Sequence, residues 1–300
     1  MNILVAGSTG FVGGEIARRL AQKGKQVRAL VRTTSDPGKV QSLKAAGAEM
    51  VEGDLKDRPS LDRACRGIET VVSTVTTMPA ATQPGDGIAA VDQAGQMNLV
   101  DAAKDAGVKH FVYVAYSGNM KDEGPLTVAK RTVERHLRES GLVYTILRPS
   151  FYMEAWLGPG VGFDYPNRKA NIYGSGEKPI SWVSAFDVAA FAVDAVNNPG
   201  ARNAVLELGG PEALSPLDVV RIFEEIGGQK FAVQHIPEEA LRAQQAAATD
   251  EYQKTFPALM LDYASGDQIE MRVTLQKFPV KLTSVSEYAS QVLATQPQSV

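Results

Sequence analysis

Apolar and polar positions repeat along the first half of the chain in a strand-and-helix pattern. Runs of consecutive apolar residues, such as 3–6, predict strands buried on both faces, and a stretch with helical periodicity follows each run. Five helix-like stretches end in glycine, which tolerates a left-handed C-terminal cap, and a β-rich run begins within three residues of each. The five glycines are Gly24, Gly47, Gly67, Gly107 and Gly141. Consecutive βαβ units follow, so the sequence predicts an α/β fold with a doubly wound, Rossmann-type parallel sheet.

The pattern changes after Pro149. Residues 151–180 are rich in glycine, proline and aromatic residues, which is typical of loops. Residues 184–196 return to helical periodicity, residues 204–208 predict the last strand, and the chain beyond 211 is predicted to be helical. The polar stretch 237–255 fits either an exposed helix or a mobile lid.

These patterns predict two domains. A Rossmann domain comprises residues 1–150 plus about 181–210, and a smaller, mostly helical, discontinuous substrate domain comprises residues 151–180 plus 211–300. Within the second domain, Ser215 before Pro216 predicts a helix N-cap, and Ser284 with Glu287 predicts a capping box.

Composition narrows the class of protein. The chain has 300 residues, 44% of them hydrophobic and 22% charged, with a formal net charge of -3. That balance is ordinary for a globular protein and gives no electrostatic footprint for nucleic acid or an anionic membrane. No apolar run reaches membrane-spanning length, and no basic segment precedes one near the start. The single cysteine, Cys65, excludes an internal disulfide, is predicted to be a core residue, and favours a cytoplasmic location.

A glycine-rich loop directly after the first strand carries the strongest functional signal. Strand, glycine turn and helix together are typical of a dinucleotide-binding loop, whose backbone amides and helix N-terminus receive a pyrophosphate. An ordinary tight strand-to-helix turn is the alternative interpretation. The residues predicted to bind a cofactor here are Gly7, Ser8, Thr9, Gly10, Phe11, Val12 and Gly13.

The end of the second strand indicates which dinucleotide is bound. An acidic residue at this position selects NAD, whereas an arginine suits the extra phosphate of NADP. The chain has Arg32 there, followed by hydroxyl residues at 33–35, so NADP is predicted over a merely solvated arginine. Asp54, after the third strand, is predicted to accept from the adenine amino group, to cap the next helix, or to do both.

Taken together, these motifs resemble the NmrA-like branch of atypical short-chain dehydrogenases/reductases. The branch includes quinone- and dye-reducing enzymes, relatives of isoflavone reductase, and cofactor-sensing regulators. The resemblance spans nearly the whole chain and continues through residues 109–113, 129–130, 147–154 and 182–189. It implies NADP(H) as cofactor. The further residues that it places along the cofactor are Asp54, Leu55, Ser73, Thr74, Val75, Lys130, Pro149, Phe151 and Tyr152.

The chain departs from the wider superfamily at the catalytic motif. Typical members carry Tyr-x-x-x-Lys, but Leu126 occupies the tyrosine position here while Lys130 is kept. Leucine cannot transfer a proton, so tyrosine-dependent ketone chemistry and sugar-nucleotide epimerisation are not expected. Lys130 becomes the leading catalytic candidate, because an ammonium can stabilise an enolate or phenolate. Its alternative role is cofactor positioning with an i,i+4 pair to Glu134.

Other polar residues have plainer interpretations. Ser117 is predicted to be a turn serine, and Tyr116 and Tyr152 are predicted to pack in the core or on the nicotinamide, or else to donate to substrate. The three histidines lack metal-ligand spacing, so no metal site is predicted, and His110 is predicted to be structural.

The sequence leaves two functions open. The first is an NADPH-dependent oxidoreductase that reduces a small apolar or aromatic quinone-, enone- or dye-like acceptor in a cleft beside the nicotinamide. The second is a non-catalytic NADP(H) sensor that binds a protein partner.

Overall fold

The computed structural model describes residues 1–295, which form two compact units. The first unit comprises residues 1–116, 125–148 and 188–206. The second comprises the other described residues. The predicted domain boundaries stay a prediction.

Seven strands form the sheet of the first unit. They are β1 Asn2–Ala6, β2 Gln26–Val31, β3 Glu49–Glu52, β4 Thr70–Ser73, β5 His110–Val114, β6 Tyr144–Pro149 and β9 Ala204–Leu208. Their order is β3-β2-β1-β4-β5-β6-β9, and the pairs from β3 to β6 are parallel. The order reverses at β1, which confirms the predicted doubly wound topology.

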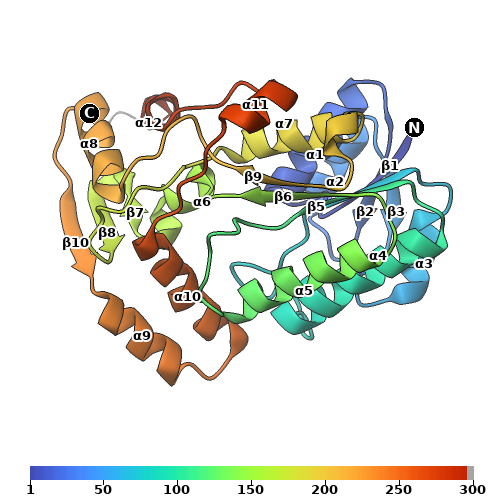
Figure 1. Ribbon diagram of the computed structural model, residues 1–300, viewed down its shortest axis with the longest axis horizontal. Coiled ribbons are helices and arrows are strands. Elements are labelled where there is room, and N and C mark those ends of the chain that lie inside the picture. Colours follow the sequence, from blue (N-terminus) through green and yellow to red (C-terminus); the bar gives the residue numbers. More distant parts are fainter. Residues whose placement is uncertain (296–300) are drawn as a thin grey trace. The chain divides into compact units, whose positions relative to one another are not determined.

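Helices cover both faces of this sheet. They are α1 Phe11–Gln22, α2 Pro37–Ala45, α3 Arg58–Cys65, the π-helix η1 Ile88–Gly95, α4 Gln96–Asp105, α5 Pro125–Glu139, α7 Ala185–Ala195 and the short η4 Pro199–Ala201. Figure 1 shows α3, α4 and α5 together on one face, with α1 and α7 on the other. Because helices shield both faces, β4 and β5 are buried along their whole length, as their largely apolar sequences predicted.

Local signals in the first unit agree with the structure. The five glycines predicted at helix ends all have left-handed backbones, with φ between 70° and 91°. Cys65 is fully buried in the apolar core, as predicted.

The second unit combines helices with a small sheet. Its strands are β7 Phe163–Asp164, β8 Lys169–Tyr173 and β10 Ala232–Ile236, and its helices are α6 Met153–Trp156, η2 Pro159–Val161, η3 Tyr165–Asn167, α8 Pro216–Gly227, α9 Glu238–Ala247, α10 Glu251–Ser265, α11 Arg272–Lys277 and α12 Val285–Ala294. Its sheet has the order β10-β8-β7, with β8 parallel to β10 and antiparallel to β7.

Two predictions for this unit need correction. Residues 151–180 contain strands and short helices rather than loop alone, and β10 interrupts the predicted helical region beyond 211. β10 is almost entirely exposed, so its sequence lacks the buried apolar run that marks a core strand. The predicted caps are confirmed: Ser215 and Ser284 each accept a hydrogen bond at the start of their helix, and residues 238–247 form a helix.

Candidate functional site

The glycine loop joins β1 to α1 and is shaped by close backbone packing. Gly7 has φ of 80°, and its carbonyl accepts a hydrogen bond from the Gly10 amide at 2.9 Å. A Cβ atom added to Gly13 would stand 2.2 Å from the Gly7 carbonyl oxygen. Side chains at Gly7 and Gly13 would therefore close this loop, and their absence leaves a backbone cradle at the start of α1.

Side chains of the glycine loop differ in how far they are buried. Ser8 Oγ donates to the Leu30 carbonyl at 2.8 Å, which ties the loop to β2. Thr9 and Val12 are half-buried, whereas Phe11 at the start of α1 is 55% exposed. The loop thus offers backbone amides and a helix N-terminus, the groups that suit an anionic pyrophosphate.

Arg32 follows β2 and belongs to a cluster of charged groups. Its Nη1 donates to Asp86 Oδ2 at 2.8 Å, and its Nη2 donates to Thr82 Oγ1 at 2.9 Å. Lys56 Nζ donates to Asp86 Oδ1 at 2.5 Å. The hydroxyl of Ser35 accepts from the Arg32 backbone amide at 2.9 Å. Arg32 is therefore not simply solvated, and the structure adds Lys56 and Asp86, which sequence analysis missed.

The donor set of this cluster fits an anion. Burial opposes ionisation of Asp86, but hydrogen bonds from Lys56, Arg32 and Thr82 outweigh it and hold the pKa of this carboxyl below its usual range. Two cations from separate loops already surround one carboxylate. A phosphate presents the same kind of oxygen acceptors, so the residues present fit a phosphate-bearing cofactor.

Asp54 and Leu55 lie between β3 and α3. Asp54 Oδ1 accepts from the Lys56 amide at 2.8 Å, whereas Asp57 is the N-cap residue of α3. Asp54 therefore caps a turn ahead of the helix rather than the helix itself, and its contact with adenine stays a prediction. Leu55 is buried in the core, 6% exposed.

Residues 73–75 comprise the last residue of β4 and the two that follow it, beside the glycine loop. Thr74 Oγ1 contacts the Ala6 carbonyl at 3.3 Å, and it would stand 2.6 Å from a Cβ on either Gly7 or Gly13. Ser73 Oγ donates to Gln96 Oε1 at 2.8 Å. The segment is thus packed directly against the glycine cradle.

Lys130 projects from α5 and is buried, 4% exposed. Its Nζ donates to the Val75 carbonyl at 3.3 Å and lies 3.7 Å from Asp92 Oδ1. The ammonium also stands over the Tyr113 ring, 5.3 Å from the centroid. The fold therefore fixes a cation beside the segment that packs on the glycine cradle.

Asp92 is the partner of Lys130 that sequence analysis missed. It lies in the π-helix η1 with no exposed surface. Its Oδ2 accepts from the amide and hydroxyl of Thr77, at 3.0 and 2.7 Å, while its Oδ1 has no hydrogen-bond partner within residues 1–295. A lone acidic residue inside the apolar stretch 88–95 was the signal that could have revealed it, since buried charges are rarely unpaired.

The electrostatics of Lys130 follow from this environment. Burial lowers the pKa of Lys130, and the Asp92 carboxylate partly opposes that effect. Glu134 forms ion pairs with Arg131 at 2.9 Å and Arg148 at 2.5 Å. The proposed i,i+4 pairing of Lys130 with Glu134 is therefore replaced by the pair with Asp92.

Two further hydroxyl candidates, Tyr116 and Ser117, already donate hydrogen bonds within the protein, and the tyrosine position of the superfamily motif holds no hydroxyl. Leu126 is buried at the tyrosine position of the superfamily motif. Tyr116 donates to Thr127 Oγ1 at 2.6 Å. Ser117, fully buried in the second unit, donates to Asp267 at 2.8 Å, in keeping with a structural serine.

Residues 149–152 lead from β6 into the second unit. Pro149 ends β6. Phe151 is 1% exposed and packs edge-on against Trp156, with ring centroids 4.6 Å apart. Tyr152 has a buried hydroxyl without a hydrogen-bond partner in the described chain, and burial raises its pKa, so it is a neutral phenol. The cofactor roles of these residues stay predictions.

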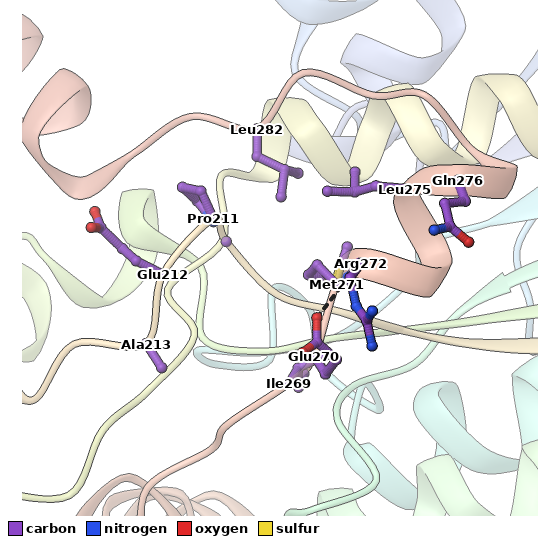
Figure 2. A pocket seen from close by; sticks show the side chains of 11 residues that line it. Pro211, Glu212, Ala213, Ile269, Glu270, Met271, Arg272, Leu275, Gln276 and Leu282 are labelled. Carbon is purple, nitrogen blue, oxygen red and sulfur yellow. Dashed lines mark hydrogen bonds between the residues drawn. The ribbon is translucent and has the colours of Figure 1, made fainter.

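A cavity of about 720 Å³ opens in the second unit (Figure 2). Its lining mixes apolar and charged side chains, and the Arg272 amide donates to Glu270 Oε1 at 2.8 Å within it. The lining residues include Pro211, Glu212, Met271, Leu275, Gln276 and Leu282. None of the residues selected from the sequence lies in it.

His110 and Cys65 are buried groups outside the site. His110 is buried against Thr145, at 2.8 Å, and burial lowers its pKa to about 4. Burial raises the pKa of the Cys65 thiol to about 12, so it is inert at neutral pH. Residues 1–295 contain no cluster of three metal-ligating side chains and no helix long and apolar enough to cross a membrane.

Comparison with known proteins agrees with this picture. The model of the NmrA-like family matches residues 1–289. An NAD(P)H azoreductase of Xenophilus azovorans is 32% identical over 76% of this chain and 74% of its own length. The photosystem II assembly factor Ycf39 of Cyanophora paradoxa is 31% identical over 79% of this chain and 72% of its own.

Solved structures share the fold. The triphenylmethane reductase of Citrobacter sp., complexed with NADP(H), superposes with a TM-score of 0.78 at 24% identity, over 96% of this chain and 99% of its own. An NADPH-dependent quinone oxidoreductase of Escherichia coli, complexed with NADPH, gives 0.78 at 22% identity, over 97% and 99%. At such identities the likeness establishes the architecture.

Proposed function

Because the chain belongs to the NmrA-like family, we propose that it is a reductase that binds NADP(H) and reduces a small, apolar, electron-poor acceptor. Quinones, enones and dyes are the acceptor classes that fit. Curated relatives above 30% identity include an azoreductase and an isoflavone reductase homologue, which supports reductase chemistry. The single observation that carries the proposal is the buried cation Lys130 beside the segment that packs on the glycine cradle.

Cofactor binding is assigned to groups that the first unit brings to the carboxyl ends of its strands. The glycine loop and the start of α1 receive the pyrophosphate, and Arg32 with Lys56 receives the ribose phosphate of NADP(H). The bound cofactor supplies the hydride. Residues 73–75 position it along the end of β4.

Lys130 acts as an electrostatic stabiliser. A lysine ammonium has three donors, and within the described chain Val75 accepts one while Asp92 pairs with the charge. Donor capacity therefore remains for an oxygen that gains negative charge as the acceptor is reduced. A reduced quinone oxygen is a stabilised phenolate and needs little proton donation, which suits a chain with Leu126 at the tyrosine position.

NADPH oxidation by the purified protein with a panel of quinones, enones and azo or triphenylmethane dyes tests this proposal. We expect turnover with at least one acceptor and a preference for NADPH over NADH. Tight NADPH binding without turnover on any member of the panel would contradict the assignment as a reductase.

A second function is a non-catalytic NADP(H) sensor that binds a protein partner. The observation that favours it is a relative of nearly equal identity, 31%, that is an assembly factor. A sensor is expected to bind NADPH without turnover and to change its proteolysis or hydrogen-exchange pattern when the cofactor binds. Identical patterns with and without NADPH would count against it. For either function, a cytoplasmic location stays a prediction.

A further inference from the structure

The charged cluster around Arg32 contains its own anion. Arg32 follows β2, Lys56 lies in the loop after β3, and Asp86 lies in the segment between β4 and η1. The two cations take different oxygens of one carboxylate, Oδ2 at 2.8 Å and Oδ1 at 2.5 Å. A single side chain thus bridges cations from two neighbouring strand ends.

Exposure within the cluster is uneven. The Asp86 side chain is 1% exposed, whereas the Arg32 and Lys56 side chains are 35% and 31% exposed. Thr82, from the same segment as Asp86, accepts from Arg32 and donates to Asp86 Oδ2 at 3.0 Å. The cations remain open to solvent while the carboxylate that neutralises part of their charge is covered.

We propose that Asp86 is an internal competitor for the ribose 2′-phosphate of NADP(H), which makes it the residue that sets discrimination between NADPH and NADH. The inference rests on the proposed function, because it assumes that Arg32 and Lys56 receive this phosphate. A carboxylate bridging an arginine fork and a lysine uses the donors that a phosphate would use, so both anions cannot be served fully at once.

The competition acts on one cofactor only. Binding of a 2′-phosphate requires Arg32 and Lys56 to exchange their hydrogen bonds from Asp86 to the ligand. A ligand without that phosphate leaves the cluster as it is. Asp86 therefore weakens the binding of phosphorylated cofactor and leaves the unphosphorylated one unaffected.

Calorimetric titration of the full chain with 2′,5′-ADP and with 5′-AMP tests this inference without measuring activity. Asp86→Asn keeps the size of the side chain and removes its charge. We expect about tenfold tighter 2′,5′-ADP binding by Asp86→Asn, corresponding to one removed ionic competitor, with 5′-AMP affinity unchanged. The matched control is Asp105→Asn, elsewhere in the first unit. It removes a carboxylate whose Oδ2 lies 2.5 Å from Nη2 of Arg58. It is expected to change neither affinity.

Two outcomes would overturn the proposal. One is an equal change in both affinities, which would make Asp86 a purely structural residue. The other is weaker 2′,5′-ADP binding by Asp86→Asn, which would mean that Asp86 orients the cations for the phosphate. Asp86→Ser repeats the measurement if Asp86→Asn fails to fold, and Lys56→Met in the Asp86→Asn background is expected to cancel the gain.

The experiment separates this inference from the proposed function. If the unmodified chain binds neither NADPH nor 2′,5′-ADP, the proposed function fails. If it binds both and Asp86→Asn leaves the ratio of the 2′,5′-ADP and 5′-AMP affinities unchanged, only the role of Asp86 is wrong.

Discussion

Asp92 and Asp86 are close in sequence, and each holds cations in the first unit, but their surroundings differ. Asp92 has no exposed surface and faces Lys130, whose side chain is 5% exposed. Asp86 is equally covered, yet its partners Arg32 and Lys56 are about a third exposed. One pair is almost fully buried, whereas the cations of the other cluster are partly exposed to solvent.

The difference separates an ion pair that keeps its carboxylate partner from a cluster in which an incoming anion can replace the carboxylate. Around Asp92, burial limits screening by water and ions, so the charge of Lys130 depends on nearby carboxylates, above all Asp92. Around Asp86, an incoming anion can reach the cations and replace the carboxylate. The first arrangement suits stabilisation of a reacting oxygen, and the second suits recognition of a phosphate.

The largest expected effect concerns the buried cation Lys130. Lys130→Met removes the charge proposed to stabilise the reduced acceptor, so we expect kcat to fall by about 10²- to 10³-fold. NADPH affinity measured by titration is expected to change far less. Steady-state kinetics with the best acceptor of the panel provide the measurement.

This variant also leaves Asp92 buried without its cation, so folding needs a control. Lys130→Met combined with Asp92→Asn removes both charges and is expected to recover most of the stability that the single change loses. Turnover recovered together with stability would show that Lys130 is structural rather than catalytic.

The next effect concerns the carboxylate of the same pair. Asp92→Asn leaves Lys130 buried without its counter-charge, and we expect the free energy of unfolding to fall by about 3 kcal/mol. The loss of the carboxylate also lowers the pKa of Lys130 further, beyond the lowering that burial already causes.

Asp92→Asn is expected to lose turnover at a lower pH than the unmodified chain. Activity requires protonated Lys130, so it falls as pH rises through the pKa of this residue. A lower pKa moves that alkaline fall to lower pH in Asp92→Asn. If kcat fell equally at every pH, Asp92 would be acting on structure alone and not through the charge of Lys130.

Sequence reasoning identified the parts of this site that depend on local pattern. The apolar run of β1 with the glycines at 7 and 13, and the arginine directly after β2, each have a local physical signature in the sequence. The doubly wound sheet followed from repeated local joints in the same way. The strand, the glycine turn and the sheet were predicted correctly because their geometry is decided within a few residues, whereas the cofactor roles of Gly7, Gly13 and Arg32 stay predictions.

The partners of Asp86 and Asp92 could not be identified by the same reasoning, although the lone acidic residue in the apolar stretch 88–95 marked Asp92 itself. Their roles depend on cations that the fold brings from β2, from the loop after β3 and from α5. Nothing within the segment before η1 or within η1 itself specifies those partners. The exposed strand β10 was missed for a related reason, because pairing with β8 rather than its own pattern makes it a strand.

A third effect tests the partly exposed cluster around Arg32. Arg32→Ala removes the fork that the proposed 2′-phosphate uses, and we expect NADPH binding to weaken by about thirtyfold, close to the loss of one charge-assisted hydrogen-bonded pair. NADH binding should change little, since NADH has no 2′-phosphate. Fluorescence titration with both cofactors measures the two changes. Equal weakening of NADPH and NADH would place Arg32 outside the phosphate site.

The smallest expected effect is the salt dependence of the stability that Asp86→Asn and Asp92→Asn each lose. Asp86→Asn leaves Arg32 and Lys56 close together without their shared carboxylate, and we expect it to lower the free energy of unfolding by about 1 kcal/mol at low ionic strength. Because these cations reach solvent, raising the salt from about 0.05 M to about 0.5 M screens their repulsion and reduces that loss. Lys130 is buried, so counterions screen it far less, and the loss in Asp92→Asn should change much less over this range. Denaturant unfolding of both variants and the unmodified chain at the two salt concentrations gives the comparison. If the two losses responded equally to salt, the cations around Asp86 would be as enclosed as Lys130, and a phosphate could not displace the carboxylate by the route proposed here.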